Sequence, residues 1–207
     1  MKIEATFITS AAEAAGVPRR GLPEVALVGR SNVGKSSLIN ALVRQRLART
    51  SAAPGKTRLA NIYQVRHGSG APLYLVDLPG YGYARGGHET ARQFDELIRE
   101  YFARASRTAD TRVRLSAILV VDARHPGLPS DIEAWRWLTA SVPRAAIVMT
   151  KVDKLARGER IRAKGELESA IEGPVLPVSA VTGEGLDELW KLIDKLANSR
   201  HPRLLNR

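Results

Sequence analysis

The sequence of 207 residues contains no cysteine, which excludes a disulfide scaffold, a thiolate zinc site and a cysteine nucleophile. It also has no apolar run near the roughly 20 residues that a membrane-spanning helix needs, and the best candidate, residues 117–121, has the length of a strand. The first ten residues lack a basic patch followed by a long apolar stretch. We therefore expect no signal peptide and a cytoplasmic location.

Acidic residues are too few to balance the basic ones. The chain has 32 lysines and arginines against 21 aspartates and glutamates, a net charge of +11. Residues 1–60 carry most of the excess, with 10 basic and 3 acidic side chains. This balance favours a polyanionic partner, nucleic acid first and an anionic membrane surface second. A hydrophobic content of 44% with 26% charged residues is ordinary for a globular protein.

Short apolar runs alternate with longer amphipathic ones along the chain. We expect strands at residues 25–28, 59–65, 73–76, 115–121, 145–149 and 175–178, and helical stripes at 94–102 and 186–196. Ser130 with Glu133 predicts a capping box at the start of a further helix. The alternation favours a single α/β domain with a mostly parallel sheet that helices cover on both faces.

Residues 29–36 match the pattern GxxxxGK[ST] and lie between an apolar strand and the helical run 38–43, which is the setting that a phosphate-binding loop requires. Backbone N–H groups of such a loop surround a phosphate. Lys35 would reach the β- and γ-phosphates, and the Ser36 hydroxyl would bind Mg²⁺. The predicted phosphate-binding residues are Gly29, Arg30, Ser31, Asn32, Val33, Gly34, Lys35, Ser36 and Ser37.

Three further loops follow the ends of predicted strands, where functional loops of such folds gather. Asp77 at a strand end can hold Mg²⁺ through water, and Gly80 can offer its N–H to a γ-phosphate. The Asp153 carboxylate can accept two hydrogen bonds from guanine that adenine does not offer, while the stem of Lys151 lies over the base, so we predict GTP selectivity. The expected nucleotide-binding residues of these loops are Asp77, Leu78, Pro79, Gly80, Thr150, Lys151, Val152, Asp153, Val178, Ser179 and Ala180.

Three segments, PEVALVGRSNVGKSS at 23–37, PGKT at 54–57 and VDLPGYGYA at 76–84, resemble the EngB (YihA/YsxC) family of bacterial GTP-binding proteins. The resemblance extends over residues 7–196. It implies one P-loop GTPase domain at 23–197, three-layered α/β/α with a mainly parallel sheet of six or seven strands. Segment 1–22 would pack on its edge, and 198–207 would form a basic tail. It also implies a role in assembling the large ribosomal subunit and a link to cell division and septation.

By this resemblance, residues 44–58 and 79–88 would be the two switch segments. The first contributes Pro54, Gly55, Lys56 and Thr57 to the nucleotide site, with Ser36 and Thr57 as Mg²⁺ ligands and Lys35 and Thr57 as catalytic residues. Tyr81 stands where many GTPases have a glutamine that orients water, so we expect slow hydrolysis, and Thr150 stands where many have asparagine. Asn32 resembles the asparagine of GTPases that use a bound K⁺; the alternative is that it only shapes the loop.

Two other classes of protein remain as alternatives. A nucleotide or small-molecule kinase shares the phosphate-binding loop, but the loops at 150–153 and 179–180 argue against it. A membrane-surface GTPase would use the basic face, but no lipidation motif supports it. The sequence favours a monomeric switch that binds GTP or GDP with Mg²⁺, docks on RNA or protein of the large ribosomal subunit or its precursor, and makes no stable membrane association.

Overall fold

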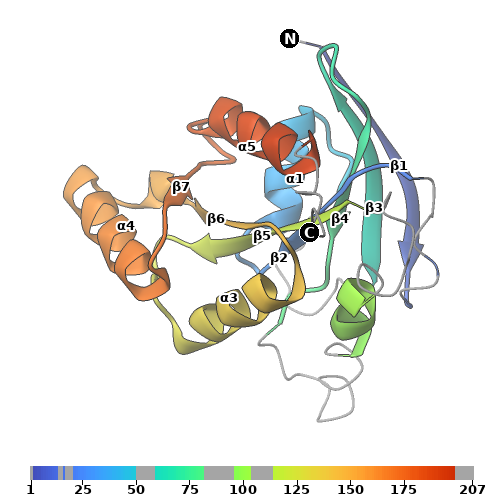
Figure 1. Cartoon of the computed structure of the whole chain (residues 1–207). Coiled ribbons are helices and arrows are strands. Elements are labelled where there is room, and N and C mark those ends of the chain that lie inside the picture. The colour runs from blue at the N-terminus through green and yellow to red at the C-terminus, as the bar shows by residue number, and fades with distance from the viewer. Residues whose placement is uncertain are drawn as a thin grey trace, which may run out of the picture.

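The computed structural model describes residues 2–13, 16, 21–49, 59–81, 96–103 and 114–198. They form a seven-stranded sheet with helices on both faces (Figure 1). Its strands are β1 (Ile3–Ala11), β2 (Glu24–Val28), β3 (Ala60–His67), β4 (Leu73–Asp77), β5 (Leu115–Asp122), β6 (Ala145–Thr150) and β7 (Val175–Pro177). The helices are α1 (Lys35–Val43), α3 (Pro129–Ser141), α4 (Arg157–Ile171), α5 (Leu186–Asn198) and the 3-10 turn η2 (Val152–Lys154), and residues 96–103 are also helical.

The strands follow the spatial order β1-β3-β4-β2-β5-β6-β7. β2 pairs in parallel with β4 and β5, and β5, β6 and β7 continue the parallel part. β3 is antiparallel to both β4 and β1. The prediction of a mainly parallel sheet of six or seven strands is therefore confirmed, with seven strands and an antiparallel edge.

The edge strand β1 lies in a segment for which the sequence predicted no strand. Its pairing with β3 changes register between Phe7 and Thr9, which interrupts the alternation of side chains on which a strand prediction depends. Only Ala11 of this strand is buried, and Phe7 is 45% exposed. An edge strand with so little burial carries a weak apolar pattern.

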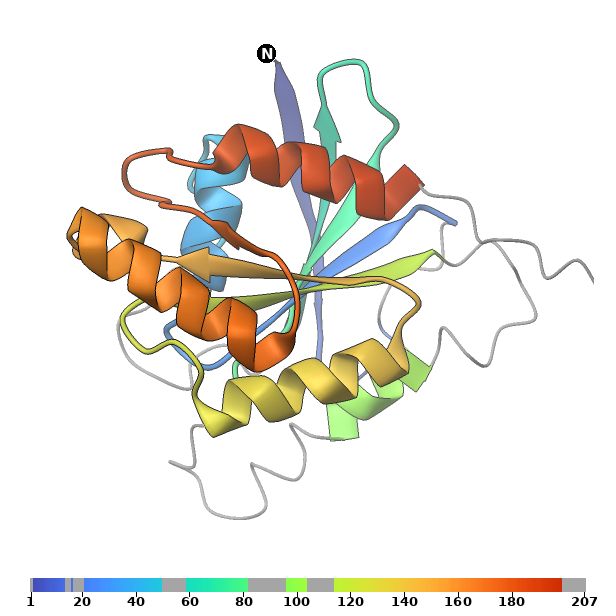
Figure 2. The same ribbon diagram turned by 60° about the vertical axis from the view of Figure 1, so that its left-hand side comes forward.

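Two apolar layers enclose the sheet, one on each face. Every residue of β2 and β5 is buried, because successive side chains of these strands enter opposite layers. One layer packs against α1 and α5, and the other against α3 and the helical residues 96–103. Figure 2 shows α1 and α5 on one side of the sheet and α3 on the other. This is the three-layer arrangement that the resemblance implied.

The predicted capping box at Ser130 and Glu133 is wrong. Helix α3 begins at Pro129, its N-cap is Leu128 in an extended conformation, and no side chain caps it. Proline fits the first helical position because its ring fixes φ and it has no N–H to leave unpaired, so the helix starts before Ser130. No helix in the described ranges is both long and apolar enough to cross a bilayer.

The strand register gathers the candidate site at one edge of the sheet. Leu27 pairs with Asp77, Val28 with Leu119, and Asp122 with Thr150. The carboxyl ends of β2, β4, β5 and β6 therefore lie side by side, and the loops that follow them share one edge.

Candidate nucleotide-binding site

The predicted phosphate-binding loop joins β2 to α1. A Cβ atom on Gly29 would lie 2.4 Å from the carbonyl oxygen of Val120, so only glycine fits where the loop crosses β5. Gly34, with φ of 106°, is the N-cap of α1, and Asn32 also has a positive φ of 64°. Val33 is 2% exposed and anchors the loop in the core. The sequence motif thus has the strand–loop–helix geometry that phosphate binding requires.

The ammonium group of Lys35 lies against the carbonyl oxygens of this loop. Its Nζ donates hydrogen bonds to the oxygens of Gly29 at 2.8 Å and Arg30 at 3.1 Å. Burial lowers the pKa of Lys35 to about 8, although the nearby Asp77 carboxylate opposes that shift. A buried cation at the start of a helix provides the positive charge that phosphate oxygens need.

Ser36 and Asp77 form the part of the site that could hold Mg²⁺. The Ser36 hydroxyl donates to Asp77 Oδ2 at 2.6 Å, while Asp77 Oδ1 is buried and has no hydrogen-bond partner among the described residues. Burial raises the pKa of Asp77, and Lys35 and Ser36 work in the opposite direction. A hydroxyl beside an unpaired carboxylate oxygen suits a hard cation such as Mg²⁺, so these residues fit the ion that the sequence predicted.

The turn that follows β4 packs directly on the phosphate-binding loop. Its first residues are buried, and Leu78 N donates to Leu27 O at 3.2 Å. Gly80 approaches Ser31 so closely that a Cβ atom would lie 2.5 Å from the Ser31 nitrogen. Ser31 N donates to Tyr81 O at 3.1 Å. Pro79, between Leu78 and Gly80, is also buried. The two predicted phosphate-contacting segments are therefore in contact with each other.

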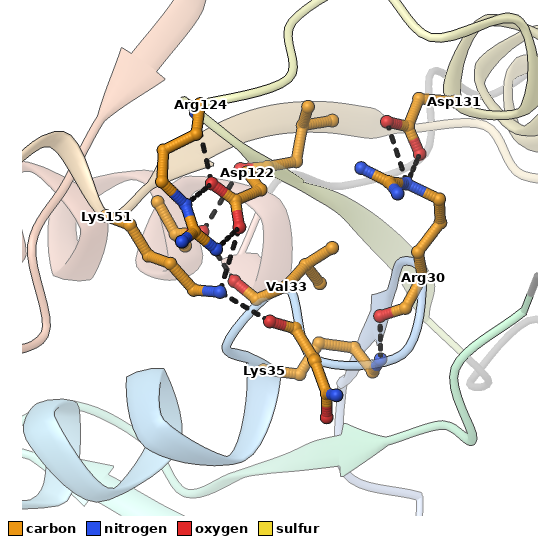
Figure 3. A network of polar contacts seen from close by, with 10 residues as sticks. Arg30, Val33, Lys35, Asp122, Arg124, Asp131 and Lys151 are labelled. Atoms are coloured by element: carbon orange, nitrogen blue, oxygen red, sulfur yellow. Dashed lines mark hydrogen bonds and ion pairs between the residues drawn. The ribbon is translucent and has the colours of Figure 1, made fainter. Parts of the chain in front are cut away.

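The loop after β6 is also bonded to the phosphate-binding loop. The Thr150 hydroxyl lies 2.6 Å from Val33 O and 3.1 Å from Val121 O, so threonine makes a side-chain bond back to the loop. Lys151 Nζ donates to Asn32 O and, at 2.8 Å, to Asp122 Oδ2 (Figure 3). These contacts fix the loop after β6 to the loop that precedes α1.

Asp153 and Ser179 bring the remaining two predicted segments together. Ser179 Oγ donates to Asp153 Oδ1 at 2.6 Å and accepts bonds from the backbone N–H groups of Val181 and Thr182. The bond from Ser179 is the main reason that the pKa of Asp153 is lowered. Val152 and Val178 beneath them are fully buried, and Ala180 is half-buried.

Two aspartates of the site were missed at the sequence level. Asp122 ends β5 and accepts hydrogen bonds from Arg124 and Lys151; burial alone would raise its pKa, but these bonds hold it well below the ordinary range. The sequence signal for Asp122 was its place directly after the apolar run 115–121. Asp131 in α3 contacts Arg30 and Tyr81, and no local pattern marks it.

Several predicted residues lie outside the described part of the chain. They include the four nucleotide-site residues expected from the first switch, most of the second switch and nearly all of the basic tail, namely Pro54, Gly55, Lys56, Thr57, residues 82–88 and residues 199–207.

The fold and these motif loops define the class of the protein, a P-loop GTPase. The family described as "50S ribosome-binding GTPase" matches residues 24–151. The chain is 40% identical over 193 residues to the probable GTP-binding protein EngB of Chlorobaculum parvum, covering 92% of this chain and 95% of that relative. The chain belongs to the EngB family of GTP-binding proteins, whose reaction is the hydrolysis of GTP.

Solved structures share the fold. A crystal structure of a probable GTP-binding protein engB superimposes with a TM-score of 0.64 at 22% identity, covering 84% of this chain and 98% of that one. Era in complex with MgGDPNP and nucleotides 1506–1542 of 16S ribosomal RNA gives a TM-score of 0.70 at 24% identity, covering 86% of this chain and 58% of Era.

Proposed function

We propose that the chain acts in the cytoplasm as a GTP-operated switch in assembly of the large ribosomal subunit. One observation carries the switch: Gly80 lies against Ser31 of the phosphate-binding loop. A γ-phosphate held by that loop would meet the N–H of Gly80, so the bound nucleotide would decide the path of the chain that follows. The GTP state would dock on the subunit or its precursor, and hydrolysis would release it. By its family resemblance, the same role links the chain to cell division and septation.

In this proposal, the side chains and backbone groups that already line the loop bind the phosphates. Lys35 exchanges its carbonyl partners for β- and γ-phosphate oxygens, and the N-terminus of α1 adds positive potential. Ser36 would bind Mg²⁺ directly, Asp77 through water, and Thr57 would complete the ligands from the first switch. When bound, Mg²⁺ neutralises charge that develops on the phosphates.

Guanine recognition in this proposal rests on Asp153. Ser179 donates a hydrogen bond that orients this carboxylate, so that it can accept hydrogen bonds from the ring N–H and exocyclic amine of guanine. The stem of Lys151 is held in place at its ammonium end by Asn32 O and Asp122. The N–H of Ala180 would meet the guanine oxygen.

Slow intrinsic hydrolysis in this proposal follows from Tyr81. Its phenol donates a hydrogen bond to Asp131 at 2.7 Å and is therefore engaged with α3 instead of with a water molecule. Burial and the neighbouring Asp131 carboxylate also raise the pKa of Tyr81, so the phenol does not act as a base at neutral pH. We expect faster hydrolysis when a partner supplies the missing group.

The basic segment after α1 offers a docking surface for RNA. Arg44, Arg46 and Arg49 are exposed, and none makes an ion pair with a described residue. Asn40 holds the segment in place, because its side chain bonds to both N and O of Ala48 at 2.7 and 2.8 Å. The family description "50S ribosome-binding" and the RNA-bound structure of Era support a ribosomal partner. A basic surface beside a switch can contact RNA phosphates in one nucleotide state.

Sedimentation with ribosomal particles tests the proposal. The protein should pellet with large subunits in a GTP analogue and much less in GDP or without nucleotide, and binding should fall steeply as salt rises. Replacing Arg44, Arg46 and Arg49 by glutamate should weaken docking and leave GTP affinity within about twofold, whereas Lys35→Ala should lose both.

A matched control reverses three exposed arginines elsewhere, Arg136, Arg157 and Arg162. This control should dock better than the first triple variant. Binding that is identical in GTP and GDP, or equal loss in the two triple variants, would contradict the switch surface.

A further inference from the structure

Three elements that are distant in the sequence meet at the buried carboxylate of Asp131. The side chain lies in the first turn of α3 and is 1% exposed. Arg30 Nε, from the phosphate-binding loop, donates to Oδ1 at 3.2 Å and Oδ2 at 3.3 Å. The hydroxyl of Tyr81, the residue directly after Gly80, donates to Oδ1 at 2.7 Å. Figure 3 shows Arg30 reaching from its loop to Asp131.

Backbone contacts connect the same two segments. Arg30 and Tyr81 form an isolated parallel bridge, and Ser31 N donates to Tyr81 O at 3.1 Å. Gly80 packs on Ser31 without room for a Cβ atom. Tyr81 is thus held at both ends, by its carbonyl on the phosphate-binding loop and by its hydroxyl on α3, and this keeps Gly80 beside that loop.

We propose that Asp131 is a positioning residue that locks Tyr81 and Arg30 together and thereby places Gly80 for its contact with the γ-phosphate. The inference rests on the proposed function, because it assigns the position of Gly80 a role in binding GTP. Asp131 acts through Tyr81 and Arg30, the two residues that donate hydrogen bonds to its carboxylate. It also ties the nucleotide site to α3, so that GTP binding and the position of α3 favour one another.

The chemistry of the three groups suits a lock of this kind. A carboxylate in the first turn of a helix interacts favourably with the helix dipole, and the guanidinium and the phenol satisfy its oxygens. Hydrogen bonds to charged groups are stronger than neutral ones. Losing the carboxylate would leave Arg30 and Tyr81 without this partner, and the turn at Gly80 would lose its support on the side of α3.

The lock predicts a loss that is specific for the triphosphate. GDP has no γ-phosphate and needs no contact with Gly80, so its affinity should stay within about twofold in Tyr81→Phe and Asp131→Asn. Affinity for a non-hydrolysable GTP analogue should fall about tenfold in each variant, which is the scale of one charge-assisted hydrogen bond. The double variant should lose no more than Asp131→Asn alone, because Tyr81 acts through its contact with Asp131.

Equilibrium titration of the full chain with fluorescent GDP and a fluorescent GTP analogue, both with Mg²⁺, measures these affinities. Tyr74→Phe is the matched control for the phenol: Tyr74 is fully buried, and its hydroxyl has no partner within the described ranges. Asp194→Asn is the control for the carboxylate, since Asp194 lies on α5, pairs with His67 of β3 and is 40% exposed. Both controls should keep the wild-type ratio of the two affinities.

The outcomes separate this inference from the proposed function. Wild-type protein that binds neither nucleotide would overturn the proposed function. Wild-type protein that binds both, with variants that lose GDP and GTP affinity equally, would show a purely structural role and overturn the lock. Losses that add in the double variant would also overturn it. Should Asp131→Asn fail to fold, Tyr81→Phe against Tyr74→Phe decides the question, because each change removes a single hydroxyl.

Discussion

Replacing Thr150 by valine tests the bond that joins the loop after β6 to the phosphate-binding loop. Thr150 is 2% exposed, and its hydroxyl lies 2.6 Å from Val33 O. Valine fills nearly the same space but leaves that carbonyl without its donor. A buried polar group that loses its partner costs about 1–3 kcal/mol, so we expect the free energy of unfolding to fall by about 2 kcal/mol. For a domain of this size, that lowers the melting temperature by about 4–8 °C.

The same substitution should also weaken nucleotide binding. Val33 O belongs to the phosphate-binding loop, so we expect GTP affinity to fall roughly three- to tenfold, since part of the lost energy holds the loop in its binding shape. Thermal unfolding without nucleotide measures the first effect, and titration with GTP measures the second. Thr150→Ser keeps the hydroxyl and should restore most of both, as should Thr150→Asn through its amide N–H.

A matched control is Thr139→Val. Thr139 is exposed, and among the described residues its hydroxyl bonds only to carbonyls of its own helix α3, so its loss should change stability by less than about 0.5 kcal/mol. The coupling of the two loops would be refuted if the Thr150→Val and Thr139→Val proteins had the same melting temperature and Thr150→Val bound GTP with wild-type affinity.

Two further predictions concern pH and salt. Asp122 has a pKa below its ordinary range in the folded protein, so this carboxylate takes up a proton at a higher pH in the unfolded chain than in the folded one. The ionised Asp122 therefore stabilises the fold at neutral pH, and this stabilisation is lost as pH falls below about 4. Melting curves between pH 7 and pH 3 should therefore show the wild type losing more stability than Asp122→Asn, and parallel losses would contradict this. GTP hydrolysis should be faster in KCl than in NaCl at matched ionic strength if Asn32 helps to bind K⁺, whereas equal rates would leave Asn32 with the shaping role that its positive φ of 64° supports.

The sequence predicted the parts of the fold that have strong local signals. Strands β2 and β5 are buried at every position, so their apolar runs were plain, and the glycines of the phosphate-binding loop sit where a Cβ atom or an ordinary φ would not fit. Strand β1 escaped prediction because its register shifts and its side chains are mostly exposed. The start of α3 was misplaced because Pro129, and not Ser130, sets it.

The residues of the candidate site could be predicted where they belong to a sequence motif, and could not be predicted where they are brought in by tertiary contacts. Lys35, Ser36 and Asp77 belong to motifs with fixed spacing, and the structure brings all three together. Asp131 belongs to no motif, since its partners Arg30 and Tyr81 are 101 and 50 residues away. Its role becomes visible only when α3 is placed beside the phosphate-binding loop.

The central claim, that the chain is a guanine-nucleotide switch, is tested most directly at Asp153. Asp153→Asn replaces the carboxylate that we propose accepts hydrogen bonds from guanine by an amide that can donate to the additional oxygen of xanthine. We predict that the variant loses GTP affinity by roughly 10- to 100-fold, the scale of a hydrogen bond to a charged group, and gains binding of xanthosine triphosphate. An exposed control, Asp187→Asn, should keep the wild-type preference. A variant that retains full GTP affinity would contradict the account, because guanine would then be recognised elsewhere.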